Sequence, residues 1–130
     1  MKRIIIRVFL LAVFVIITGF VGLYAWGEYS LRQNIKKAKE KYGGKAEDAL
    51  IAYLLDESNS PWDRSHLAIN TLGQIKSEKA IPILKQLYKN DPEGKTCKGH
   101  HDKVLCQYEI YKALNAAEVN WLPLHAHLNH

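Results

Sequence analysis

The feature that most constrains this chain is an apolar run near its N-terminus. From Val8 to Trp26, nineteen consecutive residues carry no charge. As an α-helix rising 1.5 Å per residue, a run of this length spans about the 30 Å hydrocarbon core of a bilayer. The run therefore predicts a single transmembrane helix that contacts lipid through residues 4–26.

A cleaved signal peptide is the alternative interpretation of the run. Three basic residues precede it, as in a signal peptide: Lys2, Arg3 and Arg7. The run is nevertheless longer than the roughly 7 to 15 apolar residues of a signal peptide, and no small-x-small cleavage site stands near its end. Tyr24, Trp26 and Tyr29 also suit a membrane interface. An uncleaved anchor is therefore favoured.

The basic excess is confined to the neighbourhood of the apolar run. The formal net charge is +5, yet residues 46–130 contain nine Lys or Arg against eleven Asp or Glu. The C-terminal part is slightly acidic, so no nucleic-acid partner is expected. We expect the basic residues after the run to contact anionic lipid head groups, although a solvated helix face explains them equally well. These residues are Arg32, Lys36, Lys37, Lys39 and Lys41.

Charge counts leave the orientation in the membrane open. Six basic residues follow the run and three precede it, which by the positive-inside rule places the C-terminal domain in the cytoplasm. A compact basic N-terminal tail is hard to translocate, however, and two cysteines close in sequence favour an oxidising compartment. We therefore expect a single-pass protein of a bacterial inner membrane, with its C-terminal domain outside the cytoplasm.

Apolar spacing predicts helices throughout the remaining chain, and no alternating run predicts a strand. We expect a tail and transmembrane helix over residues 1–27, a basic juxtamembrane helix or linker over 28–44, and a helical domain over 45–130. Ser60 before Pro61, and Ser77, are candidate helix caps. A last short helix is expected over residues 119–128, with Pro123 near its start.

Two successive helical segments carry a repeat pattern. The pattern in the first segment consists of Arg64, Ala68, Leu72 and Gly73. In the second segment it consists of Ala80, Ile81, Pro82 and Leu84. Together they resemble the HEAT family, especially its short bacterial form, and the resemblance covers about residues 45–128. The later unit departs from the pattern, with Cys106 in the place of Arg64 and Asn115 in that of Gly73.

The resemblance implies an all-α fold, in which the anchor is followed by a short right-handed α-solenoid of about three helical pairs. It also implies a non-enzymatic, protein-binding or scaffold role for an unknown protein partner. Such pairs bury their apolar faces only by stacking. The residues expected in the core or at its cap are Leu67, Leu72, Ile81, Leu84, Leu114 and Trp121. Trp121 is expected to close the end of the array, so that Trp121→Ala unfolds the domain.

An inserted loop at 91–105, which makes this junction about ten residues longer than the preceding one, separates the well-matched unit at 61–89 from the degenerate later unit. The stretch "KTCKGHHDKVLC", residues 95–106, covers most of this loop and ends at the first residue after it. A disulfide between Cys97 and Cys106 is the favoured interpretation, with Gly99 supplying the turn. A zinc site made of Cys97, His100, His101 and Cys106 is an alternative, although its spacing is unlike common zinc motifs. In the third interpretation Cys106 is a small core residue and Cys97 a free thiol.

The other histidines give weaker signals. His125 and His127 are two positions apart, about 200° around a helix, and cannot readily share one ion there. His66 stands beside the apolar stripe of its helix and is expected to face solvent. No enzyme motif is present, so no catalytic residue and no cofactor are expected. The sequence favours a membrane-anchored scaffold module, with two alternatives: a metal-binding or redox-responsive protein centred on Cys97 and Cys106, and a small accessory subunit of a membrane complex.

Overall fold

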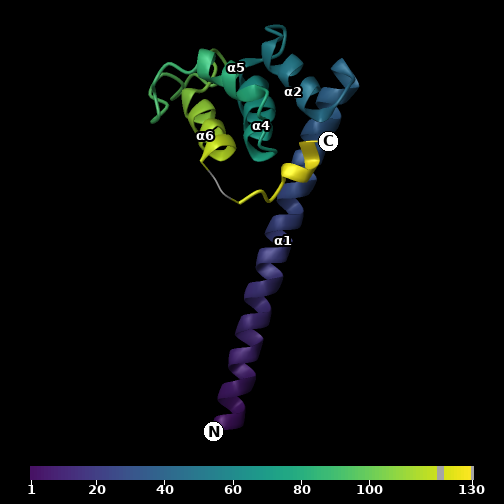
Figure 1. The fold of residues 1–130 in the computed structure, drawn as a ribbon. Coiled ribbons are helices and arrows are strands. Elements are labelled where there is room, and N and C mark those ends of the chain that lie inside the picture. Colours follow the sequence, from purple (N-terminus) through teal and green to yellow (C-terminus); the bar gives the residue numbers. More distant parts are fainter. Residues whose placement is uncertain (120–121, 130) are drawn as a thin grey trace. The chain divides into compact units, whose positions relative to one another are not determined.

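The computed structural model describes residues 1–119 and 122–129, and the regular secondary structure of this part of the chain is all helical, without a strand. The all-α prediction is thus confirmed for the described residues. The elements are α1 (Lys2–Tyr42), α2 (Ala46–Leu55), α3 (Pro61–Asp63), the π-helix η1 (Arg64–Ile69), α4 (Asn70–Gln74), α5 (Ala80–Leu87), α6 (Gln107–Glu118) and the 3₁₀-helix η2 (Ala126–Asn129) (Figure 1).

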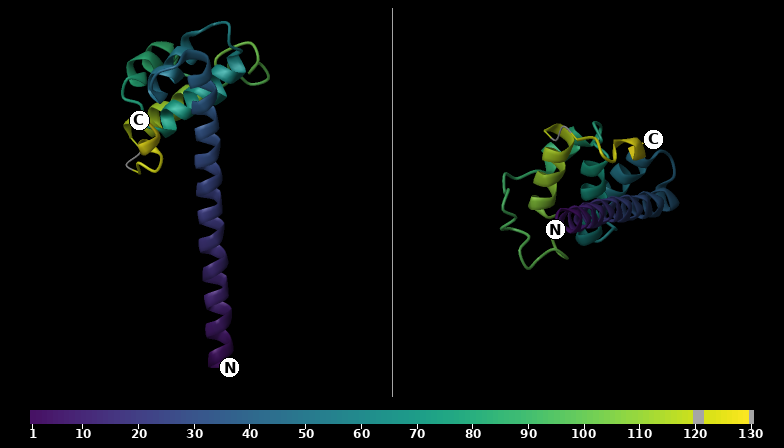
Figure 2. Two further views of the ribbon diagram at one scale, coloured as in Figure 1. Left: turned by 90° about the vertical axis from the view of Figure 1, so that its right-hand side faces the viewer. Right: turned by 90° about the horizontal axis from the view of Figure 1, so that it is seen from below.

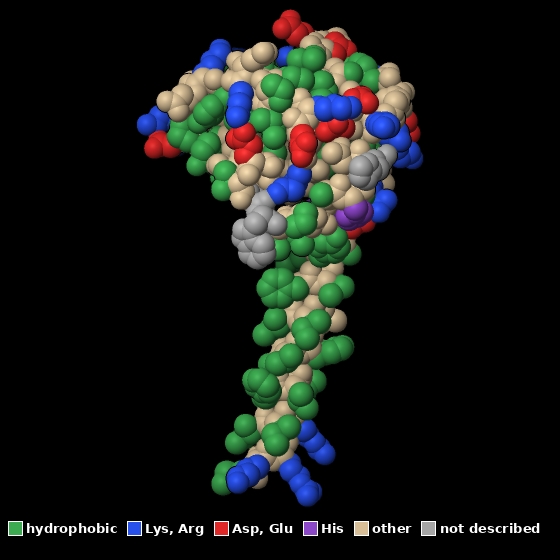
Figure 3. All heavy atoms as spheres, in the orientation of Figure 1, with side chains coloured by type: hydrophobic (Ala, Val, Ile, Leu, Met, Phe, Trp, Pro, Cys, Tyr) green, Lys and Arg blue, Asp and Glu red, His purple; other side chains and the backbone are tan. Residues whose placement is uncertain are grey.

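The chain divides into two units, Met1–Leu31 and Arg32–His130. In the first unit, apolar side chains cover the helix and basic side chains gather at its N-terminal end (Figure 3). Its most apolar stretch of 18 residues has a mean hydropathy of 2.9, and no part of that stretch is buried. By length and composition this helix is compatible with a single-pass membrane anchor or a signal sequence.

The second unit has a hydrophobic core in which α4 and α6 lie side by side (Figure 1). Leu67, Leu72, Leu84 and Leu114, all expected in the core, are buried. Ile81 is only partly buried. The buried stripe of α5 runs through Ala80 and Leu84, so that Ile81, about 100° further round the helix, lies at its edge. Trp121, the expected cap, lies outside the described residues.

The juxtamembrane segment, expected over residues 28–44 as a helix or linker outside the domain, is part of the second unit from Arg32 onward. Ala38 is fully buried, and the Asn34 amide donates to the Thr71 hydroxyl over 3.0 Å. The helix then ends at Gly43 and Gly44, whose φ angles are +71° and +75°. Glycine adopts this left-handed conformation without penalty. The domain therefore begins before Lys45, because the end of α1 supplies part of its core.

Ser60 caps α3 as predicted, and its Oγ accepts the N–H of Asp63 over 3.1 Å. Ser77 Oγ accepts the N–H of Ala80 over 3.2 Å, but Lys79 and not Ser77 directly precedes α5. The prediction of a helix over residues 119–128 is wrong. α6 ends at Glu118, and among the described residues after it the short 3₁₀-helix η2 is the only helix. Pro123 lacks an N–H and disfavours a helical conformation at the residue before it, which explains the break.

Candidate functional site

The inserted loop connects α5 to α6 through residues 88–106 and projects from the helices in both views of Figure 2. Asp91 fixes its first turn. The Asp91 carboxylate accepts the N–H groups of Lys95 (3.0 Å) and Thr96 (2.9 Å) and the Thr96 hydroxyl (2.8 Å). The N–H of Thr96, above all, lowers the pKa of Asp91. The chain just before Cys97 is therefore held by a single carboxylate.

Gly94 lies inside this turn, where no other residue fits. Its φ is +65°, and a Cβ atom there would lie 2.8 Å from the Tyr108 Cβ and 3.1 Å from the Cys97 sulfur. Both the conformation and the close approach require glycine. Gly94 thus lets the loop pack directly against the start of α6.

The two cysteines meet at the base of the loop. Their sulfur atoms lie at disulfide distance, their Cα atoms are 5.0 Å apart, and both residues are buried. Gly99, with a φ of +78°, lies between them as the predicted turn residue. Cys106 directly precedes α6, and its N–H donates to Ser65 Oγ in η1 over 2.9 Å. The pair therefore fastens the loop to the helices.

His101 completes a cluster with the two cysteines. Its ligand nitrogen and the two sulfur atoms all lie within 4.8 Å of one another. The Nδ1 atom of His101 is buried and has no hydrogen-bond partner among the described residues. His100 is exposed and is not part of this group. Of the four residues predicted as possible metal ligands, the structure brings three together.

His66 is the residue that sequence reasoning misplaced, because it does not simply face solvent. Its ring lies 4.0 Å from that of Trp62 and 5.4 Å from that of His101, between centroids. Its Nδ1 lies 3.8 Å from Glu109 Oε1, and its Nε2 is buried without a hydrogen-bond partner among the described residues. Burial lowers the pKa of His66, although the nearby Glu109 acts in the opposite direction.

His66 reaches this position because residues 64–69 form a π-helix. Such wide turns are frequent at functional sites. One sequence signal could have predicted that His66 is covered by another side chain. Trp62 lies one turn before His66, and rings four positions apart on a helix lie on the same face. A small cavity of about 160 Å³ opens beside the cysteines and His101. The cluster can therefore undergo thiol–disulfide exchange or bind a soft cation with small-molecule access.

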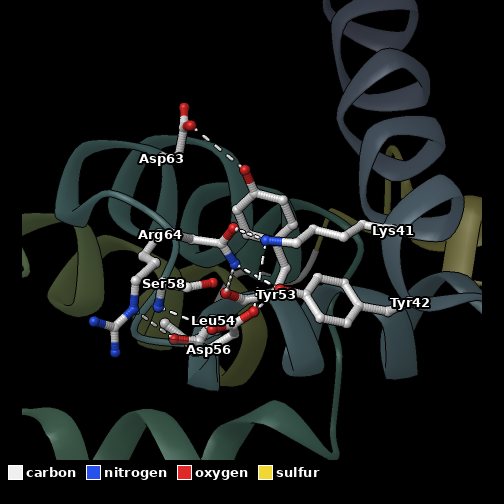
Figure 4. A network of polar contacts seen from close by, with 9 residues as sticks. Lys41, Tyr42, Tyr53, Leu54, Asp56, Ser58, Asp63 and Arg64 are labelled. Carbon is white, nitrogen blue, oxygen red and sulfur yellow. Dashed lines mark hydrogen bonds and ion pairs between the residues drawn. The ribbon is translucent and has the colours of Figure 1, made fainter.

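The basic residues at the end of α1 divide into two sets by helix phase. Lys37 pairs with Asp63 at 3.4 Å, and Lys41 donates to Asn59 Oδ1 over 2.6 Å and lies 3.5 Å from Asp56. Both belong to a polar network that joins α1 to α3 and to the turn before it. Figure 4 shows Lys41, Asp56 and Asp63 in this network. These two lysines therefore stabilise the packing of α1 within the second unit.

Tyr42 and Asn59 complete that network (Figure 4). The Tyr42 hydroxyl donates to Asp56, and the Asn59 amide donates to the Tyr42 hydroxyl over 2.8 Å and to the Tyr53 carbonyl over 2.9 Å. Hydrogen bonds from Ser58 and then from Tyr42 hold the pKa of Asp56 well below its ordinary value.

The other basic set borders an open groove of about 530 Å³ in the second unit. Arg32, Lys36 and Lys39 stand at i, i+4 and i+7 and so share one helix face. The other lining residues are Ile35, Glu40, Ala46, His127 and Leu128. The groove thus combines cationic side chains with an apolar surface. The C-terminal histidines are separated: His127 borders the groove, whereas His125 is buried.

Comparison of this chain with protein-family models, with curated protein sequences and with solved structures found no match.

Proposed function

We propose that this chain is a membrane-anchored, non-enzymatic interaction module that binds an acidic segment of a protein partner in the groove beside α1. The groove is the observation that carries the proposal, because it combines a row of cationic side chains with an apolar surface on one face. In this proposal the first unit is a single-pass anchor in a bacterial inner membrane, contacting lipid through residues 4–26.

The second unit lies outside the cytoplasm in this proposal. Two observations support that side of the membrane. The sulfur atoms of Cys97 and Cys106 lie at disulfide distance, and disulfides persist mainly in oxidising compartments. The basic N-terminal tail, with Lys2, Arg3 and Arg7, favours retention of the N-terminus in the cytoplasm.

We further propose that the helices form a short right-handed α-solenoid of about three pairs, related to HEAT repeats. Contacts between successive segments support this arrangement, since repeat arrays are held together by neighbouring units. Arg64 Nε donates to the Leu54 carbonyl over 2.7 Å, which links the first repeat helix to the one before it. The position of Gly73, a residue of the HEAT-like pattern, lies against Ala113 of α6.

The chemistry of the groove suits an amphipathic acidic segment. Glu40 lies 3.8 Å from Lys36, and both side chains are about two-thirds exposed. An exposed pair of this kind contributes at most about 1 kcal/mol, so a partner carboxylate can replace Glu40 at little cost. Ile35, Ala46 and Leu128 offer apolar contact to the other face of the same segment.

The direct test is co-purification of the full chain in mild detergent, comparing the wild type with the double variant Lys36→Glu, Lys39→Glu. We expect loss of a stoichiometric protein partner by tenfold or more. The matched control is Lys103→Glu, a charge reversal on the exposed part of the inserted loop, which leaves the partner bound. A partner that stays bound to the double variant contradicts the groove. Release of anionic lipid instead, without any protein, assigns the groove to lipid head groups.

A stoichiometric partner that is itself a membrane complex would identify the chain as an accessory subunit. That outcome keeps the groove as the binding surface, provided the same double variant removes the complex. Lipid contact through all five predicted basic residues is less well supported, because Lys37 and Lys41 are held by Asp63, Asp56 and Asn59.

A further inference from the structure

We propose that Cys97, Cys106, His101 and His66 together bind a thiophilic divalent cation, with zinc as the expected ion, when the two cysteines are reduced. This site is separate from the basic groove, and neither requires the other. Its ligands come from two places in the chain, the inserted loop with its junction to α6 and the π-helix η1.

Three of the ligands are already close together. The donor atoms of Cys97, Cys106 and His101 lie within 4.8 Å of one another. In a tetrahedral zinc site, with Zn–S near 2.3 Å and Zn–N near 2.0 Å, ligand atoms are separated by roughly 3.5 Å. Donor atoms no more than 4.8 Å apart therefore need only a small inward shift of the histidine, and the sulfur atoms must separate once their bond is broken.

His66 lies outside this group of three, and we assign it as the fourth ligand because its ring faces that of His101 and one of its nitrogens is unused. Its ring centroid is 5.4 Å from that of His101. The Nε2 of His66 and the Nδ1 of His101 are both buried, and neither has a hydrogen-bond partner among the described residues. Leaving buried polar atoms without a partner is unfavourable. A shared metal ion satisfies both nitrogens.

We expect Glu109, whose Oε1 also pairs with Lys112 at 3.0 Å, to orient His66 in the metal-bound state. The carboxylate lies 3.8 Å from the Nδ1 of His66, and Glu109 is itself buried. Metal-bound histidines usually donate their second N–H to such a carboxylate, which fixes the ring and the tautomer. With Nδ1 on the side of Glu109, Nε2 is the atom left for the metal. Trp62 packs on the same ring at 4.0 Å and restricts its movement.

Charge and access are consistent with a reduced, metal-bound state. A small dithiol reductant transfers two electrons and two protons to the Cys97–Cys106 bond, which becomes two thiols, and the dithiol is oxidised to its own disulfide. Zinc then displaces both thiol protons and binds two thiolates and two neutral imidazoles, so the site carries no net charge. Neutrality suits the buried cysteines. The cavity of about 160 Å³ beside Cys97, Cys106 and His101 offers a route for reductant and ion.

The test uses the full chain, purified in mild detergent without a histidine tag, reduced with a phosphine and freed of oxygen. Zinc is titrated against a chromophoric competitor, and cobalt is bound as a spectroscopic probe. We expect one equivalent of zinc, release of two protons on binding, and a tetrahedral cobalt spectrum with thiolate charge transfer. An octahedral cobalt spectrum without thiolate bands, or no stoichiometric zinc binding, overturns the proposal.

Variants assign the ligands. His101→Gln and His66→Gln are each expected to weaken zinc binding by at least tenfold, and Glu109→Gln by about tenfold through loss of orientation. The matched control is His100→Gln, because His100 is adjacent but exposed and outside the cluster. Its zinc affinity should change by less than twofold. A loss in His100→Gln equal to that in His101→Gln overturns the assignment.

Reduction of the cysteines could also unfold the second unit. Circular dichroism of the reduced chain, with and without zinc, covers that case. If the reduced chain unfolds and zinc restores its helical signal, binding and folding are coupled at this site, as in other small metal-binding domains. If zinc does not restore the signal, the proposal is overturned.

Discussion

A Cβ atom placed on Gly73 would lie 2.6 Å from the Cα of Ala113 and 2.9 Å from its Cβ. Real Cβ atoms do not approach backbone this closely, so α4 and α6 can lie side by side here only because residue 73 has no side chain. The contact joins the two helices at the centre of the second unit. It also explains in physical terms why this chain has glycine at position 73.

We expect Gly73→Ala to lower the free energy of unfolding by about 1 to 3 kcal/mol, the usual cost of overpacking. Alanine favours the helix by up to about 1 kcal/mol, but the obstacle is backbone of α6, which cannot rotate away. Denaturant unfolding followed by circular dichroism measures the difference. Gln74→Ala, at the exposed neighbouring position, is the control and should leave the transition unchanged. A Gly73→Ala variant as stable as the wild type contradicts the close approach.

Removing the cysteine pair should destabilise the second unit through its unfolded state. Closing a loop of about ten residues with a disulfide stabilises a protein by roughly 2.5 to 3 kcal/mol in the chain-entropy model. The variant Cys97→Ala, Cys106→Ala is expected to lose this amount, measured as unfolding free energy without reductant. As an internal control, reductant should lower the stability of the wild type and leave that of the variant unaffected. A thiol assay that finds two free thiols in non-reduced, metal-free wild type contradicts the disulfide.

Acid should loosen the start of the inserted loop at Asp91. The pKa of its carboxyl is lowered from 3.8 in the folded chain, first of all by the N–H of Thr96. The contribution of Asp91 to stability is therefore complete above its unfolded pKa and is lost as the pH falls through the lower, folded pKa. Carbon-detected NMR titration should give a midpoint below 3.8, together with a shift of the Lys95 and Thr96 amide signals. Asp91→Asn should abolish that amide shift, and a midpoint at or above the ordinary value contradicts the turn.

Local patterns predicted the helices well, because their signals depend on neighbouring residues. The apolar run and the Ser60–Pro61 start each act within a turn or two of the chain. The predicted helix over 119–128 failed at Pro123, where backbone restriction outweighed apolar spacing.

Relationships between distant residues were harder to predict. His66 and His101 are thirty-five positions apart, and no periodicity relates them. The two basic sets on α1 also look alike in sequence, and only the contacts of Lys37 and Lys41 with Asp56, Asn59 and Asp63 separate them. The sequence alone pointed to the cysteines and to the basic segment. Which neighbouring residues belong to each site depends on the three-dimensional packing.

The end of α1 should be required for folding of the second unit. A fragment of residues 30–130 is expected to show one cooperative thermal transition, whereas a fragment starting at Lys45 should lack it. The shorter fragment loses the buried Ala38, the bond from Asn34 to Thr71 and the Tyr42 bonds to Asp56 and Asn59. At about 0.5 to 1.5 kcal/mol per hydrogen bond, and with a total stability of about 5 to 15 kcal/mol, this loss is large.

Two substitutions in the longer fragment test whether α1 stabilises the second unit by packing against it or only by making the fragment longer. Ala38→Asp buries a charge at a fully buried position and is expected to remove the cooperative transition, because an unpaired buried carboxylate costs several kcal/mol. Lys39→Gln, at the exposed next position, should leave the melting temperature within a degree or two. Differential scanning calorimetry of the four proteins measures these outcomes directly. If the fragment from Lys45 melts at the same temperature and as cooperatively as the longer one, α1 is not part of the folded domain.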